Sequence, residues 1–410
     1  MRHSYQEDST GDSPLLKVEF EVGRTLILQP KQVVRGTVVL IIPERSRSLW
    51  VSGVKIRFRG EEIASVKSKD AETGTMRRAN VARTIYFERN YVVWPSALES
   101  QPRANEYRPW SELNSGIYRF DFALKLPAVN FPPSIEGPKG FSIRYIWQPI
   151  IEGSGGPLVE GPEVVTLFIP ISFAPPAEEW IFRDTLYYDN KPQKKMNSLI
   201  EVEAVLPKHV FSPGEEIKIS LSLTNRSNGR ITRVQISLRK HYEGPLDTEF
   251  VCEKHERALV SSDKRCDIGT TGGRITGNLE FFLSIPPKFY QVPPTFEGRH
   301  LRVYYTLRCV IQSEMGRLFT KMQYHEVTIP IAIAPYAHIP HDKISELNFP
   351  SHEESQLSPF FFDPREDFPP DDKETQNKNG ALSYDSILNL PLNNYVNEDY
   401  SSEDRSSGFT

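Results

Sequence analysis

A tandem repeat of turns and alternating strands most constrains the fold of this chain. Residues 211–241 (FSPGEEIKISLSLTNRSNGRITRVQISLRKH) begin with the Pro213-Gly214 turn and continue with two runs in which every second residue is apolar. A side-chain period of two indicates half-buried antiparallel strands. The inward positions of the two runs are Ile217, Ile219, Leu221 and Leu223, then Ile231, Val234, Ile236 and Leu238.

The same plan occurs in the first half of the chain. Residues 33–62 carry Gly36 where the later segment has Gly214, and their second run alternates at Val54, Ile56 and Phe58. Two segments that repeat in one order indicate a duplicated unit, which outweighs any single local pattern.

A second pair of segments supports the duplication. Residues 122–151 and 281–311 each contain an apolar run ending in Pro, a Pro pair, a Glu-Gly dipeptide and an aromatic strand. The Glu-Gly dipeptides are Glu136-Gly137 and Glu297-Gly298. The spacing from Pro127 to Tyr145 is 18 residues, and the spacing from Pro286 to Tyr304 is the same.

Length and patterning predict an all-β protein with two tandem immunoglobulin-like β-sandwich domains. A chain of 410 residues suits two domains with additional segments, and no part shows a sustained helical period. We expect a disordered N-terminus at 1–14, a first sandwich at 15–176, a linker at 177–196, a second sandwich at 197–337 and a disordered acidic tail at 338–410.

Charge separates the predicted tail from the rest. Residues 338–410 contain 5 Lys or Arg and 15 Asp or Glu, so they carry a net charge of -10 while the remainder carries +6. The tail is also rich in Pro, Ser and Asn, and it buries too little apolar surface to offset the entropy of ordering. Opposite charges suggest that the tail docks on the body and covers a binding surface, although salt screens such attraction beyond about 10 Å.

The sequence favours a cytoplasmic protein. Three cysteines in 410 residues are few for a disulfide framework. The first 14 residues lack the apolar stretch of a secretory signal, and no apolar run approaches the roughly 18–20 residues of a membrane span.

The repeated motifs, taken in order, resemble those of the arrestin family, and specifically a fungal-type α-arrestin (arrestin-related trafficking adaptor). The resemblance covers about residues 15–335. In the first half it rests on 34–40 (VRGTVVL), 54–61 (VKIRFRGE), 120–122, 126–127, 131–134 and 140–145 (GFSIRY). In the second half it rests on 211–215 (FSPGE), 223–227 (LTNRS), 285–287, 303–305 and 329–331.

The resemblance implies two arrestin lobes and no catalysis. It implies an adaptor that binds membrane-protein cargo and recruits trafficking machinery for endocytosis, commonly a HECT-type ubiquitin ligase, at the plasma membrane or endosomes. Such ligases read Pro-Pro-x-Tyr or Leu-Pro-x-Tyr, and neither occurs; Pro286 to Tyr290 (PPKFY) has one residue too many. Direct ligase binding is therefore in doubt, while the adaptor interpretation does not depend on it.

Two other functions are weighed. An arrestin-fold sorting subunit of a retrieval coat shares the fold, but the long acidic tail and the fungal-type motifs argue against it. A secreted carbohydrate-active β-sandwich enzyme requires a signal peptide and a carboxylate pair across a cleft. The first is absent, and pairs such as Glu61-Glu62 and Glu215-Glu216 are expected at solvated turns.

Two groups of residues are candidates for partner binding. Tyr384 and Ile387 fit the Tyr-x-x-apolar pattern that a clathrin adaptor binds as an extended strand, although four residues with two fixed positions also match by chance. A predicted polar loop at 65–83 carries cations for phosphorylated cargo or anionic lipid, although a solvated loop is the simpler interpretation. Its candidate contact residues are Lys67, Lys69, Arg77 and Arg78.

The tail holds further candidates. Ser358-Pro359 resembles a proline-directed phosphorylation site, and Ser401 lies in an acidic context. A phosphate at either serine adds about -1.5 to -2 charges. The apolar run 360–362 (FFF) is either a binding motif or a chance cluster.

No cofactor, metal or nucleic acid is expected. Cys252, His255, Cys266 and His241 lack the spacing of a zinc site, and Cys309 is expected to be a core thiol. We find no phosphate loop, nucleophile elbow or dinucleotide fingerprint. A pI of 6.2 without a basic aromatic stripe argues against nucleic acid.

Overall fold

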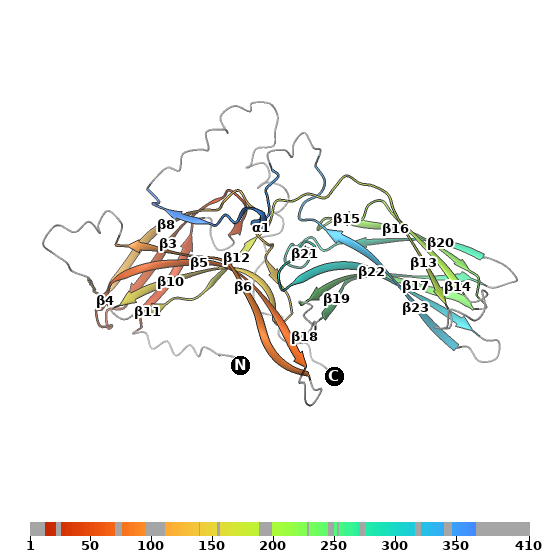
Figure 1. Cartoon of the computed structure of the whole chain (residues 1–410), viewed down its shortest axis with the longest axis horizontal. Coiled ribbons are helices and arrows are strands. Elements are labelled where there is room, and N and C mark those ends of the chain that lie inside the picture. Colours follow the sequence, from red (N-terminus) through yellow and green to blue (C-terminus); the bar gives the residue numbers. More distant parts are fainter. Residues whose placement is uncertain are drawn as a thin grey trace, which may run out of the picture.

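The computed structural model describes residues 13–21, 26–69, 76–95, 111–138, 140–153, 156–187, 199–227, 229–244, 250–251, 254–269, 275–315, 321–339 and 347–365. These residues form two lobes built almost entirely of strands (Figure 1). The described helices comprise one short segment, α1 (His352–Ser355), which is far too short to cross a membrane. The predicted all-β class is therefore confirmed.

The first lobe packs a four-stranded sheet, ordered β1-β3-β8-β24, against a larger sheet with the path β18-β5-β10-β12-β2. In the larger sheet β6 pairs with β5, and β9 and β11 pair with β10. The first-lobe strands are β1 (Leu15–Phe20), β2 (Ile27–Leu28), β3 (Val33–Ile42), β4 (Leu49–Val51), β5 (Gly53–Lys69), β6 (Met76–Trp94), β7 (Ser111–Leu113), β8 (Gly116–Lys125), β9 (Ile135–Glu136), β10 (Phe141–Gly153), β11 (Gly156–Glu160) and β12 (Val164–Phe168).

The second lobe repeats this plan. A four-stranded sheet, β13-β14-β16-β20, faces a six-stranded sheet with the path β15-β23-β22-β17-β19, in which β21 pairs with β22. Its strands are β13 (Trp180–Tyr187), β14 (Leu199–Leu206), β15 (Val210–Phe211), β16 (Glu216–Asn225), β17 (Arg230–Glu243), β19 (Lys254–Ile268), β20 (Ile275–Ser284), β21 (Phe296–Glu297), β22 (Arg302–Met315) and β23 (Lys321–Ile333). Two further strands, β18 (Phe250–Val251) and β24 (Phe360–Phe362), join the sheets of the first lobe.

The alternating residues face the cores as predicted. Ile217, Ile219, Leu221 and Leu223 of β16 are at most 1% exposed, and so are Val54, Ile56 and Phe58 of β5. In the first lobe, the Phe58 ring stacks on Trp147 with centroids 4.0 Å apart. Burial of such large side chains supplies the main stabilisation of each sandwich.

One hydrogen bond occurs in both lobes. The buried phenol of Tyr145 donates to the Pro132 carbonyl at 2.6 Å, and the buried phenol of Tyr305 donates to the Pro293 carbonyl at 2.5 Å. In each lobe the acceptor belongs to the repeated Pro pair. The shared bond supports the predicted duplication, with Tyr305 rather than Tyr304 as the counterpart of Tyr145.

The two Glu-Gly dipeptides lie where the lobes meet. A Cβ at Gly298 would lie 2.6 Å from the Glu62 carboxylate, and a Cβ at Gly137 would lie 3.1 Å from the Tyr242 ring. Each glycine therefore allows its turn to approach the opposite lobe closely. The repeated motif that reveals the duplication also builds the contact between the two copies.

Glu62 corrects a prediction. Instead of lying at a solvated turn, it is 0% exposed on β5 and accepts backbone hydrogen bonds from a turn of the second lobe. The donors are the N–H groups of Arg299 (3.2 Å), His300 (2.7 Å) and Leu301 (2.6 Å), together with the Tyr86 phenol. Because a buried carboxylate needs such donors, Glu62 holds the lobes together.

The prediction of a polar loop at 65–83 is also wrong. β5 continues to Lys69 and β6 begins at Met76, so most of this segment is a β-ladder that extends from the first lobe beside β18 (Figure 1). Backbone pairing explains the difference, because a ladder forms without apolar alternation when its strands extend an existing sheet. β18, which follows β17 in the chain, pairs with β5 through Val251 and Lys67.

Two other segments differ from expectation. The linker predicted at 177–196 contains β13, which pairs along its whole length with β14. The tail predicted to be disordered from 338 contains α1 and β24 within the described residues 347–365. β13 pairs with the next strand along the chain, whereas β24 pairs with the sequence-distant β8.

Candidate functional site

The C-terminal segment 347–365 returns to the first lobe and covers one edge of its four-stranded sheet (Figure 1). Its first contact is apolar, because Leu347 and Phe349 are at most 8% exposed and cluster with Ile171. The segment thus begins on a small core of its own, separate from the main core of the lobe.

Asn130 connects the segment to the loop after β8. Its side-chain amide donates to the carbonyls of Ile171 (3.0 Å) and Phe349 (3.2 Å), and its side-chain oxygen accepts from the Ile171 N–H at 2.8 Å. Its backbone N–H donates to the Pro350 carbonyl at 2.8 Å, and its carbonyl accepts from the His352 N–H at 3.0 Å. Its side-chain nitrogen and both backbone groups therefore bond this segment, while its side-chain oxygen bonds Ile171.

Helix α1 places a histidine in the first lobe. Ser351 caps the helix in a capping box with Glu354, which fixes where the turn starts. The His352 ring is 8% exposed and lies 4.8 Å from the Phe131 ring, with its Nδ1 3.1 Å from the Leu357 carbonyl. Burial lowers the pKa of His352.

β24 completes the covered edge. It pairs antiparallel with β8, placing Phe360, Phe361 and Phe362 opposite Lys125, Leu124 and Ala123. Phe361 points into the sandwich, where its ring stacks on Tyr91 and meets Phe122 and Trp147 edge-on. The apolar run 360–362 is therefore a sheet strand with an aromatic anchor.

Two arginines hold the backbone on either side of β24. The Arg89 Nε donates to the Pro359 carbonyl at 3.2 Å, and the Arg35 Nη1 donates to the Pro364 carbonyl at 2.6 Å. Arg35 also lies over the Phe362 ring, 5.9 Å from its centroid. The two carbonyl hydrogen bonds recognise an extended backbone, whereas the contact between Arg35 and Phe362 depends on an aromatic side chain.

The covered edge has no counterpart in the second lobe. β20 takes the place of β8 there, and it is the outer strand of its sheet among the described residues. The two lobes therefore differ where β24 lies. An edge strand with an adjacent apolar pocket is the physical requirement for binding another extended segment.

The basic candidates are only partly brought together. Lys67 lies opposite Arg78, and Ser68 lies opposite Arg77, on the β5–β6 ladder, while Lys69 lies opposite Met76. The register places these four cationic positions within one hairpin. Tyr384, Ile387 and Ser401 lie outside the described residues.

The remaining candidates lie in ordinary structural settings. His241 is within 2.8 Å of the Thr306 hydroxyl and stacks on Tyr304, whereas Cys266 lies near the Ile231 carbonyl at the other end of β17. Cys252 lies outside the described residues. No group of three or more potential metal ligands occurs in the part of the chain that is described. Cys309 is 0% exposed, and burial raises its pKa to about 12.

Sequence reasoning missed the roles of Asn130, Arg35 and Arg89 and the ring contacts of Phe361. The only available signal was the FFF run itself, because the other residues acquire their roles through pairing across more than 200 positions.

Comparison with protein families agrees with this architecture. Residues 16–166 match the family described as "Arrestin (or S-antigen), N-terminal domain". Residues 197–338 match "Arrestin (or S-antigen), C-terminal domain". A search of curated proteins found no match to the chain. The two matches correspond to the two lobes and together span well over half of the sequence, so the chain belongs to the arrestin family.

Proposed function

We propose that this arrestin-like adaptor binds an extended cytoplasmic segment of a membrane protein along β8 and links that cargo to trafficking machinery. Arrestin-family proteins are generally non-catalytic adaptors. The finer assignment to a fungal-type α-arrestin, to endocytosis and to ubiquitylation is part of the proposal.

The pairing of β24 with β8 carries the proposal. It demonstrates that this edge accepts an extended strand, because the chain's own segment occupies it. The strand is held by backbone pairing, by Arg35 and Arg89, and by the Phe361 ring, which stacks on Tyr91. A cargo segment with an aromatic residue at the Phe361 position meets the same requirements.

Cargo must compete with β24 for the β8 edge. A tethered segment acts at a high effective concentration, so cargo binds only when it offers additional contacts or when the segment is released. The cationic β5–β6 hairpin is a candidate for those contacts, with phosphorylated cargo or anionic lipid as the partner.

Recruitment of machinery is assigned to the residues beyond 365. The sequence lacks Pro-Pro-x-Tyr, so a HECT-type ligase would bind through another motif or indirectly, and Tyr384 with Ile387 offers a clathrin-adaptor motif. We propose a cytoplasmic location with a fraction recruited to the plasma membrane or endosomes, which cell fractionation tests directly.

Proximity labelling tests this division of roles. The intact chain is compared with a chain that ends at His338, which retains the Ala174 contact of His338 and loses α1 and β24. We expect the shortened chain to label membrane proteins at least as strongly and to lose trafficking proteins. Labelling of neither class by either chain would contradict the proposed function.

A further inference from the structure

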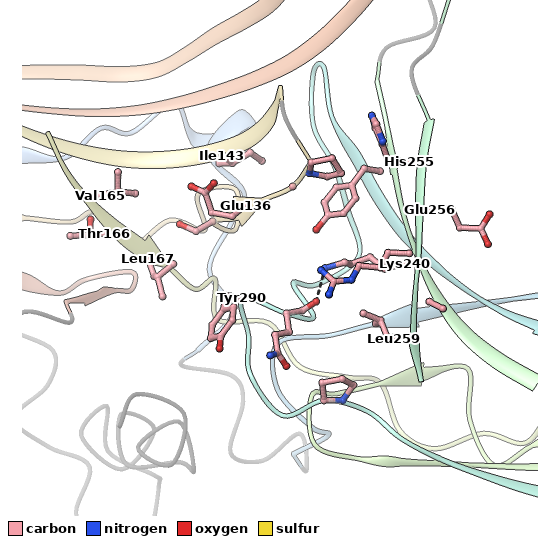
Figure 2. A pocket seen from close by; sticks show the side chains of 18 of the residues that line it. Glu136, Ile143, Val165, Thr166, Leu167, Lys240, His255, Glu256, Leu259 and Tyr290 are labelled. Carbon is pink, nitrogen blue, oxygen red and sulfur yellow. Dashed lines mark hydrogen bonds between the residues drawn. The ribbon is translucent and has the colours of Figure 1, made fainter. Parts of the chain in front are cut away.

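A cavity of about 1160 Å³ lies between the two lobes. Figure 2 shows it between Glu136, Ile143 and Leu167 of the first lobe and Lys240 and Tyr290 of the second. Much of its wall is apolar. Its volume slightly exceeds the upper end of the roughly 300–1,000 Å³ of typical small-molecule sites.

Lys240 is a buried cation that faces this cavity. The residue is 5% exposed, its Nζ donates to the Gln291 carbonyl at 2.6 Å, and it lies over the Tyr242 ring at 5.1 Å. An ammonium group has three donors. Among the described residues the other two have no protein acceptor, and the group lines the cavity.

A second cation lies directly opposite. Arg257 of β19 is the register partner of Lys240 of β17, and it also lines the cavity. Like charges at directly opposite positions of an antiparallel pair destabilise the pair. Arg257 is exposed and forms no ion pair within the described ranges, so solvent rather than a carboxylate screens its charge.

The carboxylates that line the cavity are already neutralised. Glu136 forms a two-pronged ion pair with Arg144, at 2.8 and 3.0 Å, and Glu256 pairs with Arg239 at 2.7 Å. The His255 ring packs edge-on against Phe141. The cavity therefore contains two cations whose charge is not balanced by its acidic residues.

We propose that Lys240 and Arg257 form an anion site in the cavity between the lobes, and that its ligand is a phosphate monoester carrying an apolar group. A phosphate dianion matches two cations, since Arg offers a two-pronged contact to phosphate and Lys a point charge. The apolar wall fits the organic part of the ester.

The titration of Lys240 agrees with this geometry. Burial, and then the charge of Arg257, lowers its pKa to about 8. A bound anion stabilises the ammonium form, so ligand binding raises the pKa of Lys240, and affinity falls as pH rises above 8.

The test uses the full chain and two probes that share one chemistry. Phenyl phosphate represents a soluble monoester, and vesicles containing phosphatidic acid represent the same group on a lipid, with phosphatidylcholine vesicles as the blank. We expect Lys240→Met and Arg257→Gln each to weaken binding at least tenfold. Arg265→Gln is the matched control, because Arg265 is an exposed cation on the same strand and does not line the cavity.

A measurement on the unaltered chain covers the case in which a variant does not fold. NMR of isotopically methylated lysines should show one resonance titrating near pH 8, shifting upward when phenyl phosphate is added. If one of the two probes binds and the other does not, the result supports the site and identifies whether the phosphate group is soluble or on a lipid. The proposal would be overturned if neither probe bound, or if both substitutions left binding unchanged. It would also be overturned if a phosphorylated peptide bound and neither probe did.

Discussion

The Phe361 ring stacks on the Tyr91 ring with centroids 5.2 Å and planes 12° apart, which fixes the C-terminal segment to β6 of the first lobe. Phe361 also meets Phe122 and Trp147, so one side chain joins the covering strand to both sheets of the sandwich. The ring contacts of Phe361 can be tested by mutation without any binding partner.

Replacing Phe361 should release β24 while leaving the lobe folded. Phe361→Ser removes an aromatic anchor, and we expect docking to weaken by roughly 2 kcal/mol or more. Hydrogen exchange should then speed up at the β8 amides 122–125. Phe360→Ser is the matched control, because Phe360 is 44% exposed. Equal exchange in both variants would show that Phe361 is not the anchor.

Glu62→Gln should weaken the contact between the lobes. The substitution keeps the shape but removes the charge that three backbone N–H groups and the Tyr86 phenol hydrogen-bond. Hydrogen bonds to charged groups contribute about 1.5–3 kcal/mol each, so we expect a clear fall in the free energy of unfolding and a broader interlobe distribution by small-angle scattering. Glu19→Gln should change neither quantity, because the Glu19 side chain is exposed and lies on β1, away from the second lobe's turn at 299–301.

The duplicated tyrosines provide a test of equivalence between the lobes. Tyr145→Phe and Tyr305→Phe each delete one buried hydrogen bond and leave a proline carbonyl without its donor, which costs about 1–3 kcal/mol. Because the two hydrogen bonds lie in different lobes and share no residue, their effects on chemical denaturation should add. A cost at only one site, or strong coupling between them, would contradict structural equivalence.

The buried Lys240 predicts a specific pH dependence of stability. Its pKa in the folded chain is about 8, below the ordinary value of 10.5. Between these values the unfolded state binds more protons, so the free energy of unfolding should rise with pH by up to about 1.4 kcal/mol per pH unit. Below pH 8 lysine is protonated in both states, and the contribution of Lys240 is constant.

The difference in unfolding free energy between the unaltered chain and Lys240→Met isolates this contribution. We expect it to shift in favour of the unaltered chain from pH 8 to 10.5. The same comparison with Lys218→Met, on an exposed strand, should show no such trend. A flat difference for Lys240→Met would contradict the lowered pKa.

Much of the fold was predictable from local patterns. Strict alternation places Ile217 to Leu223 and Val54 to Phe58 in the cores, because a period of two sends every second side chain to one face. The repeated Pro pairs and Glu-Gly dipeptides revealed the duplication. Their structural roles, a tyrosine hydrogen bond and a close contact between lobes, required the tertiary structure.

The missed features depend on strand pairing and register, which local patterns do not reveal. β24 pairs with β8 across more than 200 positions, and nothing in a Pro-rich acidic tail predicts which edge it will join. The β5–β6 ladder around Lys67 and Arg78 lacks apolar alternation, so its sequence resembles a loop. Lys240 and Arg257 become opposed only through a register that includes an irregularity after Leu238.

Competition for β8 tests the central claim most directly. Hydrogen exchange of the full chain is followed while extended peptides from membrane-protein cytoplasmic segments, with an aromatic residue for the Phe361 pocket, are added. We expect a binding peptide to keep β8 protected, to expose the amides of 360–362, and to bind more tightly to Phe361→Ser than to Phe360→Ser. Peptides that bind while β24 stays protected, with equal affinity for both variants, would contradict it.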